Sequence, residues 1–123
     1  MNIKIDDLDK AVREELESYS REVGEAVDNA VLRVAKRCLA SIKANSPESS
    51  RAYQKGWTMA KETMRSRLLA VIYNRKRWFL VHLLENGHQK ASGGRVSGTP
   101  HVGPAADQAE RELVPEIIRE LGG

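Results

Sequence analysis

Apolar residues recur at nearly helical spacing through the first third of the chain. The stripe consists of Val12, Leu16, Tyr19, Val23, Val27, Val31, Val34, Cys38 and Ile42, with a mean spacing of about 3.75 residues. This period is closer to that of a straight helix than to the 3.5 of a left-handed coiled coil. It predicts one helix over about 6–45, which Pro47 ends because proline disfavours the helical conformation of the residue before it. Such a helix would span about 60 Å, so either Gly24 breaks it or another subunit buries part of the stripe.

After Pro47 the pattern changes to alternation. Tyr53, Trp57 and Met59 fall on odd positions and would share one face of a strand. The run RLLAVIYN, which begins at Arg67, is rich in β-branched and aromatic residues, as strands are. Together these segments predict an antiparallel β-hairpin over about 52–74, with a second strand that is apolar on both faces.

Two further helices are predicted. The first covers about 75–86, with a broad apolar face, and Gly87 fits the residue that closes a helix. Residues 88–103 have the composition of a flexible loop. Pro104 then opens a last helix over about 104–121, which Pro115 should kink or divide. The expected fold is one α+β domain over 1–123: a long N-terminal helix, a small antiparallel β-hairpin, and two further helices packed on it.

Composition narrows the class of protein. The chain has a single cysteine, which excludes an intramolecular disulfide. Its N-terminal residues are charged, and its apolar runs are far shorter than the roughly 20 residues that span a bilayer. We therefore expect a soluble intracellular protein without a membrane contact.

The net charge of +3 is mild, but its distribution is uneven. Between Lys61 and Arg77 there are six basic residues against the single acid Glu62. Such a cluster either keeps a sheet edge from pairing with other strands or forms a surface for phosphates or an acidic protein.

Three histidines and a glutamate raise the question of a metal site. His82, Glu85, His88 and His101 would be the ligands of a zinc hydrolase. Their spacing differs from the metalloprotease motif, in which two histidines lie one turn apart on one helix, and His88 follows the helix-closing Gly87. Cys38 lies on the apolar stripe, as an inert buried thiol would. We predict no catalytic residue, no cofactor and no metal.

Several short motifs occur in a familiar order. They are Ser46-Pro47 before the first strand, Tyr73-Asn74 at the end of the second, Leu84 to His88 at a helix end, and Pro100 to Ala105 at the start of the last helix. In this order the chain resembles the gene-product-ten-type neck, or tail-completion, family of lambda-like siphophages and prophages. Many members carry Thr-Gly where this chain has Ser49 and Ser50.

The resemblance implies a non-enzymatic structural protein of a tailed phage. Members form rings at the junction between head and tail, so the implied partners are further copies of the chain and the adjacent neck or tail proteins, with possible DNA contact in the channel. The implied location is the virion, with the host cytoplasm during assembly. We expect docking through Trp57, Arg75, Arg77, His88, Lys90 and Arg95. The alternative is a small basic DNA-associated protein of the phage or its host.

Overall fold

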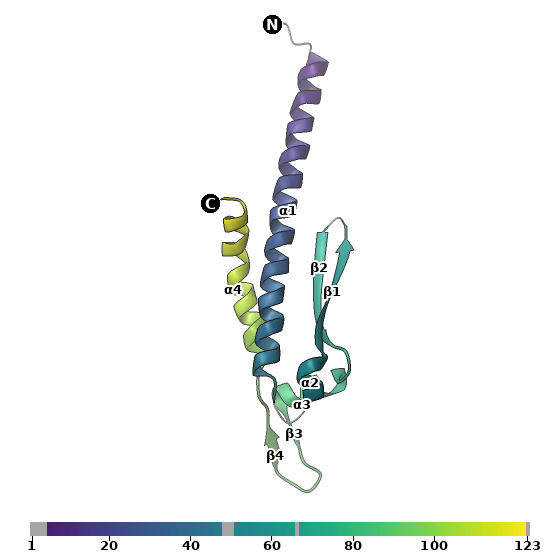
Figure 1. The fold of residues 1–123 in the computed structure, drawn as a ribbon, viewed down its shortest axis with the longest axis vertical. Coiled ribbons are helices and arrows are strands. Elements are labelled where there is room, and N and C mark those ends of the chain that lie inside the picture. The colour runs from purple at the N-terminus through teal and green to yellow at the C-terminus, as the bar shows by residue number, and fades with distance from the viewer. Residues whose placement is uncertain (1–4, 48–50, 66, 123) are drawn as a thin grey trace.

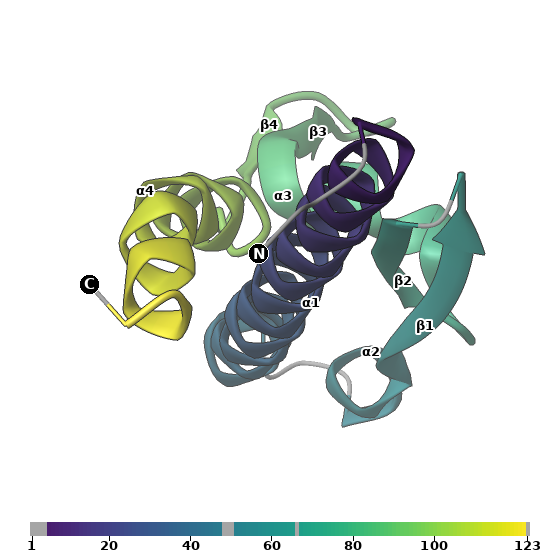
Figure 2. The same cartoon turned by 90° about the horizontal axis from the view of Figure 1, so that it is seen from above.

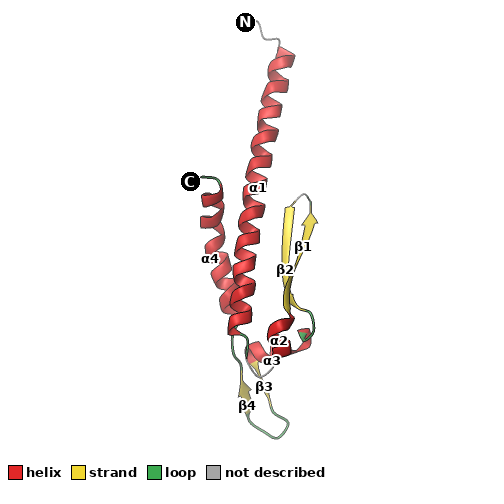
Figure 3. Ribbon diagram, in the orientation of Figure 1, coloured by secondary structure: helices red, strands yellow, loops and turns green. Residues whose placement is uncertain are grey.

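The computed structural model describes residues 5–47, 51–65 and 67–122, with side chains from Leu8 onward. Its elements, in chain order, are α1 (Ile5–Asn45), α2 (Arg51–Gly56), β1 (Trp57–Met64), β2 (Arg67–Asn74), a 3-10 helix η1 (Trp78–Leu80), α3 (Val81–Asn86), β3 (Gly87–Gln89), β4 (Arg95–Ser97) and α4 (Gly103–Glu120). Because helices and antiparallel strands occur together in this fold (Figure 3), the predicted α+β class is confirmed. The turn that holds Ser49 and Ser50 lies outside the described residues.

Helix α1 is the axis of the molecule. Its C-terminal half lies between α4 on one side and the β1–β2 hairpin on the other (Figures 1 and 2). The helix is continuous through Gly24, so the first of the two alternatives for its length is wrong. Its N-terminal part extends well beyond both neighbours (Figure 1). Within the described ranges, no other element therefore covers the stripe on that part of the helix.

The predicted hairpin begins five residues too early. Residues Arg51–Gly56 form the short helix α2 and only Trp57 starts the strand. Tyr53 therefore does not share a strand face with Trp57; the two rings instead meet edge to face, with centroids 5.7 Å apart. A spacing of four residues fits one helical turn as well as it fits an alternating strand, so the pattern misled at this position.

From Trp57 to Asn74 the hairpin is as expected. Strands β1 and β2 are antiparallel, with Trp57 opposite Asn74 and Met64 opposite Arg67. Arg65 has a φ of +51°, the left-handed conformation that a two-residue hairpin turn requires. In β2, Ala70 and Ile72 are half-buried and their neighbours are exposed, so only one face of the hairpin is covered.

The predicted helix over 75–86 is divided in two. Residues 75–77 form a turn, η1 follows, and the α-helix starts only at Val81. Asn74, which is 2 % exposed, fixes this turn: its Oδ1 accepts a bond from the Arg77 amide (2.8 Å), and its Nδ2 donates to the Tyr53 carbonyl (2.7 Å). A Cβ at Gly56 would collide with the Asn74 side chain, so this close approach requires glycine.

Residues 88–103, predicted as a loop, contain a short hairpin that their composition does not predict. His88 pairs with Val96 in an antiparallel ladder between β3 and β4, which projects from one end of the molecule (Figure 1). Gly93 and Gly94 both have positive φ, a conformation that glycine adopts readily in the turn between the two strands. Gly87 has a φ of 81° and a ψ of 178°, which ends α3 and starts the strand directly.

Helix α4 is as predicted at its start, with Pro104 in the first turn. Of the two outcomes predicted for Pro115, the division into two helices is wrong, because α4 continues through this residue to Glu120. Ion pairs fasten α4 to α1 on both sides of the proline. Arg37 contacts Glu112 and Glu116, each at 3.0 Å, and Arg33 contacts Glu120.

The core is small and lies toward the C-terminal end of α1. Its buried residues are Ile42, Tyr53, Trp57 and Ala105. Half-buried side chains pack around them, namely Cys38, Leu39, Ile72, Leu80, Val81, Leu84 and Val102. The helices α1, α2, α3 and α4 thus all contribute side chains to this one core.

Candidate assembly surfaces

The N-terminal half of α1 exposes a row of large apolar side chains, which we call the bare stripe. Their exposed fractions are 52 % for Leu8, 50 % for Val12, 62 % for Leu16 and 66 % for Tyr19. The same helix buries Ala30, Val34 and Ile42 further along. Isolated exposed apolar residues are common, but a contiguous row of this kind marks an interaction site.

A second uncovered apolar surface lies between α4 and β2. Two adjoining cavities of about 280 and 420 Å³ share Cys38, Ala70, Ile72 and Ala106 among their lining residues. Together they form one open trough, which we call the apolar groove. Its floor is the part of α1 from Val31 to Ile42, and its walls are β2 and α4.

Two exposed aromatic residues, Trp78 and Phe79, lie at or beside the larger cavity of this groove. Trp78 is 70 % exposed and lines the larger cavity, and Phe79 beside it is 52 % exposed, with the rings 5.8 Å apart. The sequence pattern placed both on an apolar helix face packed against the sheet. The 3-10 turn instead directs them outward, while Leu80, Val81 and Leu84 reach the core. A tryptophan next to three basic residues was the signal available for an interface, since interfaces are rich in tryptophan and arginine.

Glu85 of α3 fastens the segment that leads into α4. Its Oε1 accepts bonds from the amides of His101 and Val102, each at 2.9 Å, and its Oε2 accepts one from Gly103 at 2.8 Å. The first amides of a helix lack partners within the helix, and Val102 provides no side-chain cap. Burial alone would raise the pKa of Glu85, but these three amide bonds outweigh it and lower the pKa. The carboxylate thus acts as the N-terminal cap of α4.

His101 continues this network into the core. Its Nδ1 lies 2.7 Å from the Thr99 carbonyl oxygen and 3.0 Å from Glu85 Oε1, so in the neutral imidazole Nδ1 carries the proton. Nε2 then accepts a bond from the Tyr53 hydroxyl at 2.5 Å. Burial raises the pKa of Tyr53 to about 12, which keeps the hydroxyl protonated as a donor.

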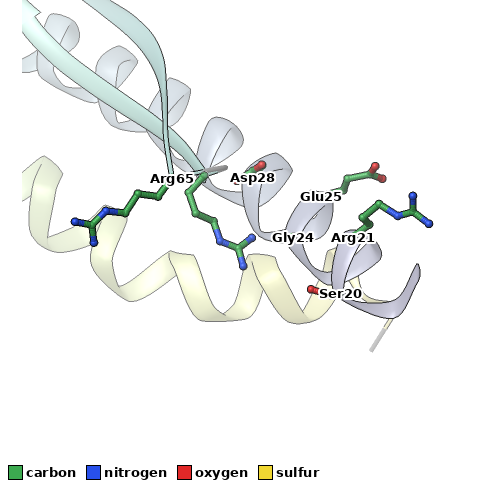
Figure 4. A pocket seen from close by; sticks show the side chains of 7 residues that line it. Ser20, Arg21, Gly24, Glu25, Asp28 and Arg65 are labelled. Carbon is green, nitrogen blue, oxygen red and sulfur yellow. The ribbon is translucent and has the colours of Figure 1, made fainter. Parts of the chain in front are cut away.

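A charged hollow of about 330 Å³ separates the hairpin end from α1. Figure 4 shows Arg65 on the hairpin and Arg21, Glu25 and Asp28 on the helix, with the side chains of Arg65 and Arg21 pointing away from one another. Asp28 Oδ1 accepts a bond from the Leu68 amide at 3.2 Å. Side chains of both signs of charge therefore line the hollow, and the bond from Leu68 to Asp28 holds β2 to α1 beside it.

The six predicted docking residues lie in different surroundings. Trp57 is 4 % exposed and packs in the core, so it offers little surface to a partner. The other five are exposed: Arg75 and Arg77 lie on the turn after β2, His88 and Arg95 on the β3–β4 hairpin, and Lys90 just after β3. Arg95 also donates to the Asn86 carbonyl at 2.6 Å.

The candidate zinc ligands have other partners. Both carboxylate oxygens of Glu85 are occupied by amides, His82 contacts Asn86, and His88 is exposed. Within residues 5–47, 51–65 and 67–122 no group of three such side chains could hold a metal ion. No helix in this described part is long and apolar enough to cross a membrane.

These features define an α+β fold with two apolar surfaces that stay exposed among the described residues and a polar network that fastens loops. A family model with the description "Bacteriophage HK97-gp10, putative tail-component" matches residues 10–87, more than half of the chain, and the chain belongs to this family. The match includes all but the last residue of the motif from Leu84 to His88 and ends before Pro100 to Ala105. No curated protein and no solved structure matches the chain. Membership supports a structural role in a phage.

Proposed function

We propose that the chain forms a ring in the neck of a tailed phage, at the head–tail connection or at the completed end of the tail. The observation that carries the proposal is the combination of family membership with an apolar stripe that stays exposed among the described residues. A protein whose apolar stripe is buried only by neighbouring molecules suits a role in assembly. The polar cluster of Glu85, His101 and Tyr53 fits a structural role, because these side chains bind one another and backbone groups.

Contacts with the adjacent neck or tail protein would use the end of the subunit that carries the β3–β4 hairpin. His88, Lys90 and Arg95 are exposed there, and this hairpin projects away from the rest of the molecule (Figure 1). A Lys90→Glu variant should lower the yield of joined particles, whereas Lys36→Glu, on the exposed side of α1, serves as the matched control.

The direct test is to locate the chain in purified virions of the phage that encodes it. Gold-labelled antibodies should mark the head–tail junction or the head-proximal end of the tail. Deletion of the gene should leave filled heads and tails that do not join into infectious particles. Absence of the chain from virions, or infectious particles formed without it, would contradict the proposal.

A small basic DNA-associated protein is the second candidate. All six basic residues of the cluster are exposed, namely Lys61, Arg65, Arg67, Arg75, Lys76 and Arg77. Binding of the isolated chain to duplex DNA, weakening steeply with salt as phosphate contacts do, would favour this function. Absence of binding at low salt removes it.

A further inference from the structure

The bare stripe and the apolar groove lie at opposite ends of one helix, and in the described part of the chain neither is covered by another element. The stripe runs from Leu8 to Tyr19 and the groove floor from Val31 to Ile42. Both segments cover eleven steps of an α-helix, or about 16 Å. The bare stripe is thus as long as the floor of the groove.

The stripe cannot enter the groove of its own chain. Helix α1 is unbroken from Ile5 to Asn45, so Leu16 and Cys38 are held about 33 Å apart by 22 residues of helix. Any occupant of the groove that uses this stripe must come from another molecule.

The walls of the groove are suited to an amphipathic helix. Small side chains on both walls, Ala70, Ala106 and Ala109, leave room for the larger side chains of an entering helix. Trp78 stands exposed at one end and can cover the end of such a helix.

The charges beside the two surfaces are complementary. Between Leu8 and Glu22 there are five acidic residues against three basic ones. Glu15 lies next to Val12 and Tyr19 on the helix surface, at spacings of three and four residues, and it is exposed. The β2 wall begins at the exposed Arg67 and is followed by the exposed Arg75 to Arg77.

From these observations we propose that the bare stripe of one copy docks in the apolar groove of a second copy, with the Glu15 side facing β2. The contact joins two different surfaces, so each copy gives one helix and receives one. Repetition of such a contact closes a ring when the rotation between copies allows it. This inference rests on the proposed function only for its setting, the assembled virion.

Cys38 makes the contact testable, because it is the only cysteine of the chain and lines the groove. We would place Leu16→Cys in the phage gene, treat purified virions with a short bismaleimide, and separate the products on a denaturing gel. Burial raises the pKa of the Cys38 thiol, so the reaction is run at mildly alkaline pH. The expected result is a ladder of dimers and higher multiples of this chain, which must be intermolecular at the helical separation given above.

Two controls share the same background. Glu14→Cys places an exposed thiol on the opposite side of the helix, and it should give at least tenfold less dimer. The Leu16→Cys chain with Cys38→Ser should give none. Val12→Cys repeats the test one turn away and keeps it decisive if the first variant assembles poorly.

The outcomes separate the two proposals. A chain missing from virions contradicts the proposed function. A chain present in virions whose position-16 and position-12 thiols fail to reach Cys38 overturns the docking inference alone. Linkage of Cys38 to a different virion protein also overturns it, because another occupant would then fill the groove.

Discussion

The two halves of α1 show what packing does to one continuous apolar stripe. In the C-terminal half, Val34 lies between β2 and α4 and is 5 % exposed, and Ile42 is part of the core. In the N-terminal half, Leu16 and Tyr19 are more than 60 % exposed. The sequence pattern is the same in both halves, so periodicity reports that a face is to be covered and not what covers it.

The halves also differ in how their polar groups are used. Around the C-terminal half, Arg37 joins Glu112 and Glu116 across two helices, and Glu85 and His101 fasten the entry to α4. In the N-terminal half, the ion pair between Arg13 and Asp9 lies within one exposed helical turn, where such pairs contribute little. Stability should therefore come almost wholly from the C-terminal half.

The largest loss of stability should follow from Trp57→Ala. Trp57 is 4 % exposed and packs against Tyr53 and His101, so its removal leaves a cavity where four helices meet. We expect the free energy of unfolding to fall by about 3–5 kcal/mol, measured by urea denaturation of the purified chain. A loss below about 1 kcal/mol would show that the core is not centred here.

A smaller loss is expected for Glu85→Gln. The carboxamide keeps one acceptor oxygen, whereas the carboxylate serves three amides, so about 1.5–3 kcal/mol should be lost. Because the pKa of Glu85 is lowered in the folded chain, its contribution is complete above the unfolded pKa near ~4.3. It disappears as the pH falls through the folded pKa.

The dependence of unfolding free energy on pH, measured for the wild-type chain and for Glu85→Gln, is the control for this prediction. The wild-type chain should lose stability on acidification below about pH 4, and the variant should lose less over the same range, since position 85 no longer titrates. Equal acid slopes for both chains would contradict the assigned capping role.

Next in size is Tyr53→Phe, which removes one hydroxyl and keeps the ring. His101 Nε2 would lose its donor in a site where the imidazole is 1 % exposed, at a cost of about 1–3 kcal/mol. The folded pKa of Tyr53 is raised to about 12, so its stabilisation is complete below the unfolded pKa of about 10. It is lost as the pH rises from there toward 12.

Denaturation at several alkaline pH values tests the sign of this effect. The wild-type chain should lose stability between pH 10 and 12 faster than Tyr53→Phe, whose other tyrosines are unchanged. A variant with the same alkaline slope as the wild-type chain would show that the Tyr53–His101 bond is not formed in solution.

The sequence predicts much of this fold because its signals are local. The end of α1 near Pro47, the pairing of Trp57 to Asn74 and the start of α4 at Pro104 each depend on a few adjacent residues. The errors occur where contacts decide. Tyr53 is helical although it alternates with Trp57, and residues 88–103 form a hairpin although they are rich in glycine.

The candidate surfaces were only partly predictable. Glu85 and His101 were weighed as metal ligands, but their role depends on bringing α3 beside the start of α4, 16 residues later. Trp78 and Phe79 were expected to be covered, as part of the apolar face of a helix. They are exposed because the run begins with a 3-10 turn that rotates its first residues outward, and the apolar pattern does not reveal such a turn. Distant partners and local backbone rotation leave no mark in a periodic pattern.

The smallest effect predicted is that of Leu16→Ala, and it is the sharpest test of the comparison. Leu16 is 62 % exposed, so its truncation removes few contacts within the chain, and alanine favours a helix slightly more than leucine. The free energy of unfolding of the isolated chain should stay within about 0.5 kcal/mol of the wild-type value. Urea denaturation measures it beside Val34→Ala, a truncation on the same helix at a residue that is 5 % exposed. That buried control should be clearly destabilised.

A large loss for Leu16→Ala alone would mean that the N-terminal half of α1 is already covered in the isolated protein. The two halves would then differ in their partners rather than in whether they have one.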